Sequence, residues 1–454
     1  MRLFTRDKSF YRMLIALAIP VALQNLITFG VNFADNLMVS ELGDTAVSGV
    51  YVANQIQTFL QLFTAGIEAA LLVLATQYWG RGETGQIKRI AAIGLQCAAG
   101  VGLLVTALCL ILPAPILSLF TNETAVVECG VGYLRIVCLS YLLFCVTQVL
   151  IATMRSVEVA RIGLVVSTVS LISNVCLNRL FIFGAIGLPA MGARGAALAT
   201  LLSRVLELGV MLVYVLRIDR RLGIRLRELL VTDPVLLRDF VRCALPLVAG
   251  QVVWGVNLMT NSAILGRFGE EVITAASVAN TMNSLAYVAM MGMAAAVGII
   301  TGKTVGEGKF ELMKEYAKTV QLLFLILGLL TGASIFLTRR PFVALYDGIS
   351  AEAAEQAVIF ITVLSVSMIG SCYQAACLMG LVKSGGDVSF VFKNDMIFVF
   401  LVVLPSAILA AWLGAAPWVV FACLKCDQIL KCFVALVKIN RYDWMKKLVR
   451  EADS

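Results

Sequence analysis

The sequence predicts an all-α polytopic membrane protein with twelve transmembrane helices in two pseudo-symmetric six-helix bundles. Three observations support this fold class. Hydrophobic residues make up 60% of the 454 residues and charged residues only 14%, whereas soluble domains have about 45–50% apolar and 25% charged residues. Apolar runs long enough to cross a bilayer follow one another with short polar loops between them. The second half of the chain also repeats the pattern of the first.

Twelve apolar runs, each bounded by charged residues or by Gly and Pro, are expected to cross the membrane. They lie at residues 12–39, 46–78, 88–112, 125–153, 160–183, 192–216, 238–266, 272–302, 314–337, 352–382, 391–412 and 416–438. A long charged stretch follows the sixth run and divides the chain. We expect an N-terminal lobe at residues 1–216, a cytoplasmic linker at 217–237, a C-terminal lobe at 238–440 and a cytoplasmic tail at 441–454.

Lys and Arg residues concentrate in alternate loops, so the positive-inside rule predicts the orientation. The basic first residues lead into the first run without a small-residue cleavage pattern, which favours a retained cytoplasmic end over a signal peptide. An even number of spans then places the C-terminus in the cytoplasm too, and the expected location is the inner (cytoplasmic) membrane. The net charge of +8 follows from this topology, and no nucleic-acid partner is expected. The only Lys or Arg residues expected in the outer loops are Arg194, Arg267, Arg339 and Arg340.

An internal repeat relates the two halves of the chain. Pro, Gly and Asn residues recur in the same order about half a chain apart. In an apolar sequence such matches are less easily due to chance than matches between apolar residues. The repeat contains six spans, an even number, so both halves enter the membrane from the same side as parallel repeats. The matching pairs are Pro20 with Pro246, Gly43 with Gly269, Asn54 with Asn280, Gly66 with Gly292, and Gly82 with Gly308.

Asp35 is the carboxylate that stands out within this repeat, because it lies on the first apolar run. A carboxylate at the middle of a bilayer costs about 2.5–3.5 kcal/mol on insertion scales, so such residues usually have a function. A proton or a Na⁺ ion could bind there. The alternative is that Asp35 only marks the outer end of the first span, because it lies about 35 Å along a helix from Arg12.

Several motifs resemble the multidrug and toxic compound extrusion (MATE) family over essentially the whole chain, with the DinF-like branch as the best match. They are Pro20 with Asp35, the M-V-S-E-L-G run ending at Gly43, Q-Y-W-G-R-G at Gln77–Gly82, the run from Asn174 to Thr200, K-S-G-G-D at Lys383–Asp387, and Trp444. The resemblance implies two six-helix bundles in a V around a central cavity. It also implies export of organic, often cationic, compounds in exchange for Na⁺ or H⁺.

The resemblance places an ion or proton site at Asp35, Asn174, Asn178 and Thr200. An amide stands at Asn178, where the branch has a second acid. Asn174 and Asn178 are four residues apart and share one helical face; a helix–helix hydrogen bond is the alternative role. The family's other branch carries acids on spans seven and ten. It is not matched, because the corresponding regions hold Trp254, Asn257 and Gln374.

Other polar residues within the spans are candidates for contacts with cargo. The predicted cavity set is Asn32, Asn54, Glu68, Asn257, Asn280 and Gln374. Glu68 has no basic residue within a helical turn; Arg135 or Arg179 could pair with it instead. Asn54 and Asn280 are flanked by small residues, so helix packing is the alternative there.

Two further features concern bends and charge pairs. Pro20 and Pro246 could act as hinges or as static kinks, because proline removes a backbone hydrogen bond. The spacing of Arg204 with Glu207, and of Asp427 with Lys431, predicts self-neutralising pairs.

The predicted function is a secondary antiporter that exports an organic substrate by alternating access, working as a monomer in the lipid bilayer, with Na⁺ or H⁺ as the coupling ion and no other cofactor. A lipid or oligosaccharide flippase and a non-transporting membrane sensor are the alternatives. An intramembrane enzyme would need a nucleophile–base pair, a metal set or a carboxylate dyad. The chain has no His, and the C-L-K-C at Cys423–Cys426 has no second pair, so neither an enzyme nor a certain metal site is expected.

Overall fold

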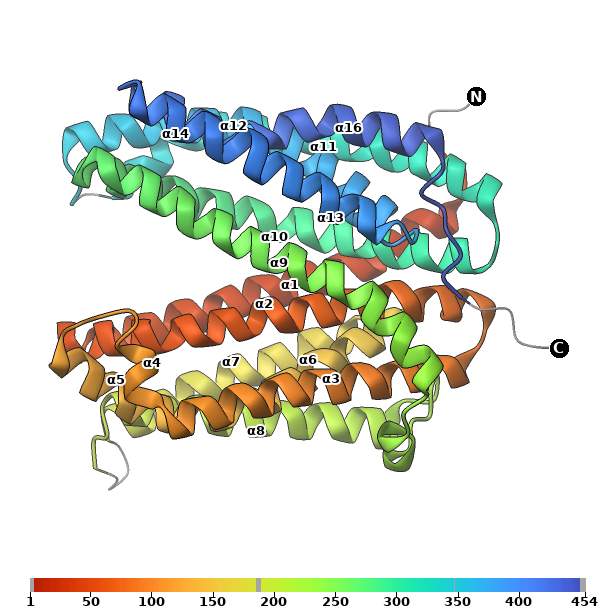
Figure 1. Ribbon diagram of the computed structural model, residues 1–454, viewed down its shortest axis with the longest axis horizontal. Helices are drawn as coiled ribbons and strands as arrows, with labels where there is room; N and C mark the ends of the chain where they lie inside the picture. The colour runs from red at the N-terminus through yellow and green to blue at the C-terminus, as the bar shows by residue number, and fades with distance from the viewer. Residues whose placement is uncertain (1–3, 185–188, 347, 450–454) are drawn as a thin grey trace. The chain divides into compact units, whose positions relative to one another are not determined.

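The computed structural model describes residues 4–184, 189–346 and 348–449, and this part of the chain is built from long α-helices (Figure 1). The α-helices are α1 (Lys8–Ser40), α2 (Asp44–Arg81), α3 (Thr84–Ile111), α4 (Pro113–Leu117), α5 (Thr124–Val137), α6 (Leu139–Ser156), α7 (Arg161–Ile182), α8 (Ala193–Val213), α9 (Pro234–Leu265), α10 (Glu270–Gly306), α11 (Phe310–Val343), α12 (Ala351–Gln374), α13 (Val388–Ile397), α14 (Leu404–Trp412), α15 (Pro417–Lys425) and α16 (Asp427–Arg441).

The predicted spans all coincide with these helices, and the all-α membrane fold is confirmed. Within the described residues, 11 helical stretches are long and apolar enough to cross a membrane. The predicted span at 125–153 is divided between α5 and α6, which meet at Cys138. The predicted span at 416–438 consists of α15 and α16, each too short alone. Three other spans contain π-helical turns, which are η1 (Tyr214–Ile218), η4 (Ala375–Lys383) and η5 (Phe398–Val403).

The chain forms two compact units that do not coincide with the lobes expected from the sequence. The N-unit is Leu23–Val248, and the C-unit is Met1–Ala22 together with Ala249–Ser454. The division falls inside α1 and α9, two residues after Pro20 and Pro246, which both lie within continuous helices. The first part of α1 therefore belongs with α10–α16, and the first part of α9 belongs with α2–α8. A hinge role for the two prolines stays a prediction.

Two glycines of the repeat let these exchanged helix segments approach their neighbours. In the N-unit, a Cβ atom on Gly66 of α2 would lie 2.6 Å from Cα of Val248 in α9. In the C-unit, a Cβ atom on Gly292 of α10 would lie 2.8 Å from the backbone nitrogen of Ala22 in α1. Small residues allow such close contact between membrane helices. The repeat seen in the sequence is thus a repeat of helix crossings.

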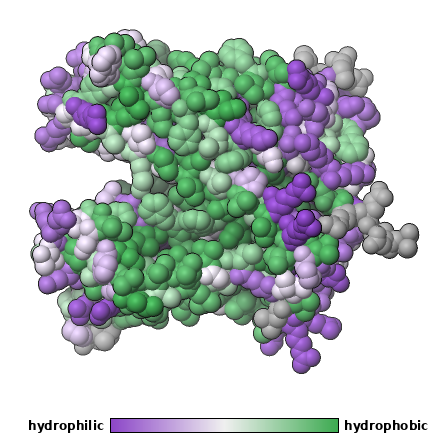
Figure 2. Space-filling view, in the orientation of Figure 1, coloured by the Kyte–Doolittle hydropathy of each residue, from purple (hydrophilic) through white to green (hydrophobic). Residues whose placement is uncertain are grey.

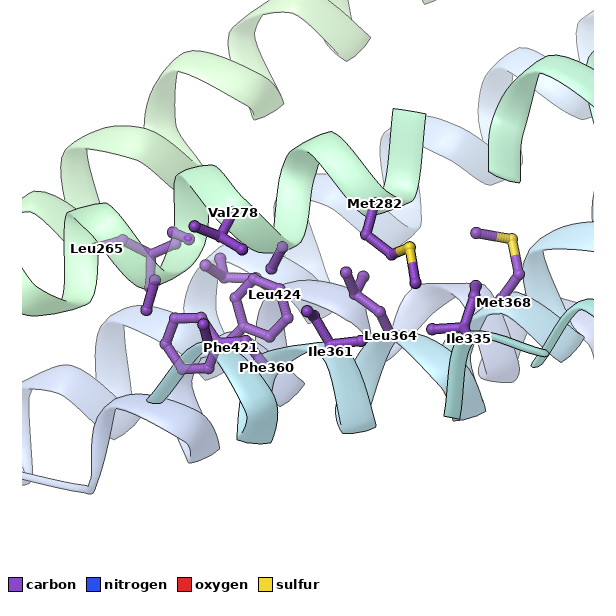
Figure 3. Close-up of a cluster of buried hydrophobic side chains, with 14 of the residues drawn as sticks. Leu265, Val278, Met282, Ile335, Phe360, Ile361, Leu364, Met368, Phe421 and Leu424 are labelled. Atoms are coloured by element: carbon purple, nitrogen blue, oxygen red, sulfur yellow. The ribbon is translucent and has the colours of Figure 1, made fainter. Parts of the chain in front are cut away.

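A cluster of buried apolar side chains in the C-unit comes mainly from α10, α12 and α15, and Leu265 of α9 and Ile335 of α11 also belong to it (Figure 3). Phe360 and Phe421 stack in parallel with their ring centroids 4.3 Å apart. On the outside, large apolar side chains such as Leu104 and Leu330 are exposed. In both units, apolar side chains cover the middle of the helices and hydrophilic ones gather towards their ends (Figure 2). Exposed apolar surface of this extent is typical of contact with lipid.

The predicted linker at 217–237 is held against the N-unit. Asp219 accepts hydrogen bonds from the backbone nitrogens of Arg221 (3.2 Å) and Leu222 (3.0 Å). Arg221 then donates to the carbonyl oxygen of Val157 in the loop before α7, and Lys88 of α3 pairs with Glu228 at 3.1 Å. The linker is therefore a packed strap.

The tail after α16 forms an equivalent strap on the C-unit; of the tail predicted at 441–454, residues 450–454 lie outside the described residues. Trp444 is fully buried and its ring lies where a Cβ atom on Gly385 would be. The backbone nitrogen of Lys446 donates to the carbonyl oxygen of Gly385 at 2.8 Å. Asp387 pairs with Lys438 and with Lys446, each at 2.8 Å. The tail thus fastens the loop before α13 to the end of α16.

The ion pairs of this strap make stability depend on pH. Burial alone would raise the pKa of the Asp387 carboxyl, but hydrogen bonds and charges from Lys438 and Lys446 outweigh burial and hold its pKa below the ordinary value. The stabilisation by these ion pairs is therefore complete above the ordinary pKa of an aspartate, about 3.9. It is lost as the pH falls through the lower pKa that Asp387 has in the folded protein. We expect Asp387→Asn to cost about 1.5–3 kcal/mol at pH 7, measured by thermal unfolding in detergent.

The same comparison at low pH provides the control. The difference between Asp387→Asn and the unsubstituted protein should shrink as the pH falls below about 4 and vanish below the lower folded pKa, where both carry a neutral side chain at this position. A stability difference that stays constant from pH 7 to pH 3 would contradict the role given to these ion pairs.

Candidate functional site

Three of the four residues predicted to bind the coupling ion meet in the N-unit. Asp35 lies on α1, and Asn174 and Asn178 lie one turn apart on α7. The side-chain nitrogen of Asn178 donates to Oδ1 of Asp35 and also to Oδ1 of Asn174, the latter at 3.1 Å. Both Asn side chains are buried. The Asp35 carboxylate is therefore anchored on a buried polar face of α7 and does not merely mark the end of α1.

The fourth predicted residue, Thr200 of α8, reaches this group through a tyrosine that the sequence did not single out. The hydroxyl of Tyr133 on α5 donates to Oδ1 of Asn54 at 3.3 Å. Thr200 and Asp35 both lie near this tyrosine, and the hydroxyl of Thr200 donates to the carbonyl oxygen of Ala196 at 3.0 Å. Asn54, predicted to contact cargo, is thus part of the same cluster. A tyrosine on an apolar helix is common in packed cores, and nothing in the sequence distinguishes Tyr133.

The predicted pair of Arg204 and Glu207 is confirmed beside this cluster. Nη1 of Arg204 lies 2.6 Å from Oε2 of Glu207, and Glu207 is only 2% exposed. The hydroxyl of Ser170 on α7 donates to the same carboxylate at 3.4 Å. The Arg204 guanidinium lies 5.0 Å from the ring centroid of Phe144 and interacts electrostatically with Asp35.

Glu68 has a different basic neighbour from the two considered in the sequence. Arg135 and Arg179 are both exposed. Glu68 on α2 interacts electrostatically with Arg155 at the end of α6, and Nη2 of Arg155 donates to Oε1 of Gln24 at 2.6 Å. The suggestion of Arg135 or Arg179 as a partner was wrong, because pairing depends on how α2 packs against α6.

The C-unit contains its own buried charge group, on α13 and α16. Nζ of Lys431 lies 2.9 Å from Asp395 and 3.1 Å from Asp427, so the predicted pair is confirmed and enlarged. Gln428 donates to both oxygens of Asp427 at 3.1 Å. Gln374 donates to Gln428, as does Ser371 at 3.0 Å.

The remaining cargo candidates are scattered. Asn32 and Asn280 are exposed, and Asn257 is half-buried. No described group hydrogen-bonds Oδ1 of Asn257. A role for Asn32, Asn257, Asn280 and Gln374 in binding cargo stays a prediction.

Comparison with known proteins places the chain in a family. A family model described as MatE matches residues 20–180 and 246–414, one segment in each half of the chain. The chain belongs to the MATE family. The two matched segments begin at Pro20 and Pro246, the prolines that open the internal repeat, so the repeat found in the sequence is that of MATE transporters.

Individual MATE relatives resemble the chain over most of its length. A probable multidrug resistance protein NorM of Thermotoga maritima is 26% identical over 79% of this chain and 75% of its own length. The multidrug resistance protein NorM of Photobacterium profundum is 25% identical over 90% of this chain and 89% of its own length.

Solved MATE structures share the fold. The Vibrio cholerae MATE transporter VcmN in the bent form superposes with a TM-score of 0.86 at 16% identity, covering 96% of this chain and 97% of that chain. A transporter of the MOP superfamily from Pyrococcus furiosus superposes with a TM-score of 0.86 at 18% identity, covering 98% of this chain and 99% of that chain. The multi-pass membrane architecture of the MATE family is thereby confirmed.

Proposed function

We propose that this MATE transporter is a secondary antiporter that exports organic, cationic or amphipathic compounds in exchange for Na⁺ or H⁺. The single observation that carries the proposal is the Asp35 carboxylate, which the side-chain nitrogen of Asn178 holds on the buried face of α7. Relatives named as multidrug resistance proteins support the cargo class. We also infer an inner-membrane location with both termini in the cytoplasm, and a functional monomer.

Asp35 would couple the two flows by competition. An ionised carboxylate in a bilayer is unfavourable until a cation or proton neutralises it. Binding of the ion therefore favours one conformation, and binding of cargo favours the other. The coupling between them is only as large as the difference in affinity of each ligand for the two states.

Both coupling ions are compatible with the groups around Asp35. A proton would need only the carboxylate and the Asn178 donor. A Na⁺ ion prefers several oxygen ligands, and the carboxylate of Asp35, the amide oxygens of Asn174 and Asn178, and the hydroxyl of Thr200 could supply them. Flux measurements distinguish these two cases.

The test is efflux of a fluorescent organic cation from proteoliposomes containing the purified protein, with a Na⁺ gradient and a pH gradient imposed separately. Export under the Na⁺ gradient alone would assign a Na⁺ site at Asp35, and export under the pH gradient alone would assign a proton site. Dye movement under neither gradient, or a rate equal to that of empty liposomes, would contradict the antiporter function.

A further inference from the structure

Position 178 holds an amide, and a buried carboxylate, Glu207, lies on the neighbouring helix α8. On α7, Ser170, Asn174 and Asn178 repeat every four residues and therefore share one face. This face lies along α8, where Thr200, Ser203 and Glu207 also share a face.

Hydrogen bonds connect both ends of this interface to carboxylates. At one end Asn178 donates to Asp35, and at the other Ser170 donates to Glu207 at 3.4 Å. Polar side chains therefore line the α7–α8 interface between the two acids, and we call this set the polar strip: Asp35, Asn178, Asn174, Ser170, Ser203 and Glu207.

Two buried atoms of the polar strip have unused hydrogen-bonding capacity. Oδ1 of Asn178 and Oγ of Ser203 are buried, and neither has a hydrogen-bond partner in the described part of the chain. Asn178 is 0% exposed and Ser203 2%. Leaving such an atom unpaired costs about 1–3 kcal/mol. Two unpaired buried atoms on one polar strip therefore point to a ligand or to a polar group that moves.

The charges beside the strip do not balance without an added cation. With both acids ionised, Asp35 and Glu207 carry two negative charges, whereas Arg204, which pairs with Glu207 at 2.6 Å and interacts electrostatically with Asp35, carries one positive charge. Tyr133 from α5 is a further titratable group that interacts with Asp35. Buried charges need compensation, so one positive charge must arrive when both acids are ionised.

We propose that Arg204 and Glu207 form the second half of the coupling site, with Arg204 as an internal cation that the two carboxylates share. When Na⁺ or a proton occupies Asp35, Arg204 neutralises Glu207. When the ion leaves, Asp35 and Glu207 share the positive charge of Arg204, and the site carries one excess negative charge until a cation binds. Glu207 thereby replaces the acid absent at position 178. This inference rests on the proposed antiport.

Removal of each charge of the Arg204–Glu207 pair provides the test. Glu207→Gln leaves Arg204 free to neutralise Asp35 permanently, so the half-saturating concentration of the coupling ion should rise about tenfold, within the usual range of coupling between sites. Arg204→Gln removes the competing cation and should lower this concentration by a similar factor. The double variant restores the net charge around Asp35 and should return towards the unsubstituted value.

The readout is the coupling-ion dependence of dye efflux in proteoliposomes, which a purely structural pair would not shift in opposite directions. Glu311→Gln is the matched control, because Glu311 pairs with Lys314 at 2.6 Å with the same spacing but is exposed. Its ion dependence should stay unchanged.

Unchanged half-saturation in both single variants would overturn the inference. If Glu207→Gln fails to fold, Arg204→Gln decides alone, and no shift in that variant would equally overturn it. Failure of the proposed function looks different, because then the unsubstituted protein itself would show no gradient-driven efflux.

Discussion

Asp35→Asn is expected to abolish gradient-driven efflux while the protein still folds. The amide nearly matches the carboxylate in shape, and its oxygen can still accept the hydrogen bond from Asn178 that the carboxylate accepts. It can neither bind a proton at physiological pH nor carry the negative charge that attracts Na⁺. The other carboxylate of the proposed coupling site, Glu207, is paired with Arg204 at 2.6 Å and so would not replace Asp35 as the group that binds the ion. Dye efflux from proteoliposomes under both gradients should fall to the rate of empty liposomes.

Asn36→Ala is the matched control for this experiment. Asn36 adjoins Asp35 on α1 but is exposed, so its loss should leave efflux unchanged. Size-exclusion profiles and thermal unfolding of both variants should resemble those of the unsubstituted protein. Full gradient-driven export by folded Asp35→Asn would refute the role given to this carboxylate.

The helices were predictable because a bilayer restricts both the length and the composition of anything that crosses it. What the sequence did not reveal depends on packing between distant segments. The break between α5 and α6 at Cys138 carries neither Gly nor Pro. The division of the units within α1 and α9 likewise follows from contacts between helices. The boundary at 217–237 was instead predicted from the charged stretch that follows the sixth apolar run.

The candidate site was predictable only in part, and for a similar reason. Asp35 is conspicuous because a charge on an apolar run is rare. Asn178, which holds it, is 143 residues away in the sequence, and only the resemblance to MATE proteins suggested that they meet. Tyr133 and Arg155 were missed, because a tyrosine or an arginine near the end of a helix has many ordinary roles. Arg204 with Glu207 was found because local spacing on one helix reports their contact directly.

Lys431→Met is expected to destabilise the C-unit strongly. Lys431 is 5% exposed and lies 2.9 Å from Asp395 and 3.1 Å from Asp427. Without the ammonium group, two carboxylates remain close together where water is scarce. Removing one partner of a buried ion pair costs about 3–5 kcal/mol. The unfolding temperature of the purified protein in detergent should fall accordingly, and the yield of folded protein should drop.

Removing all three charges separates this effect from a loss of packing. The triple variant Asp395→Asn, Asp427→Asn and Lys431→Met removes all three charges of this group, so its stability should recover most of the loss, because replacing a whole buried ion network is often nearly neutral. Lys314→Met serves as the control, since Lys314 pairs with exposed Glu311 and a surface pair contributes little. Equal losses in Lys431→Met and in the triple variant would show that the volume and contacts of the lysine side chain, and not its charge, stabilise this part of the C-unit.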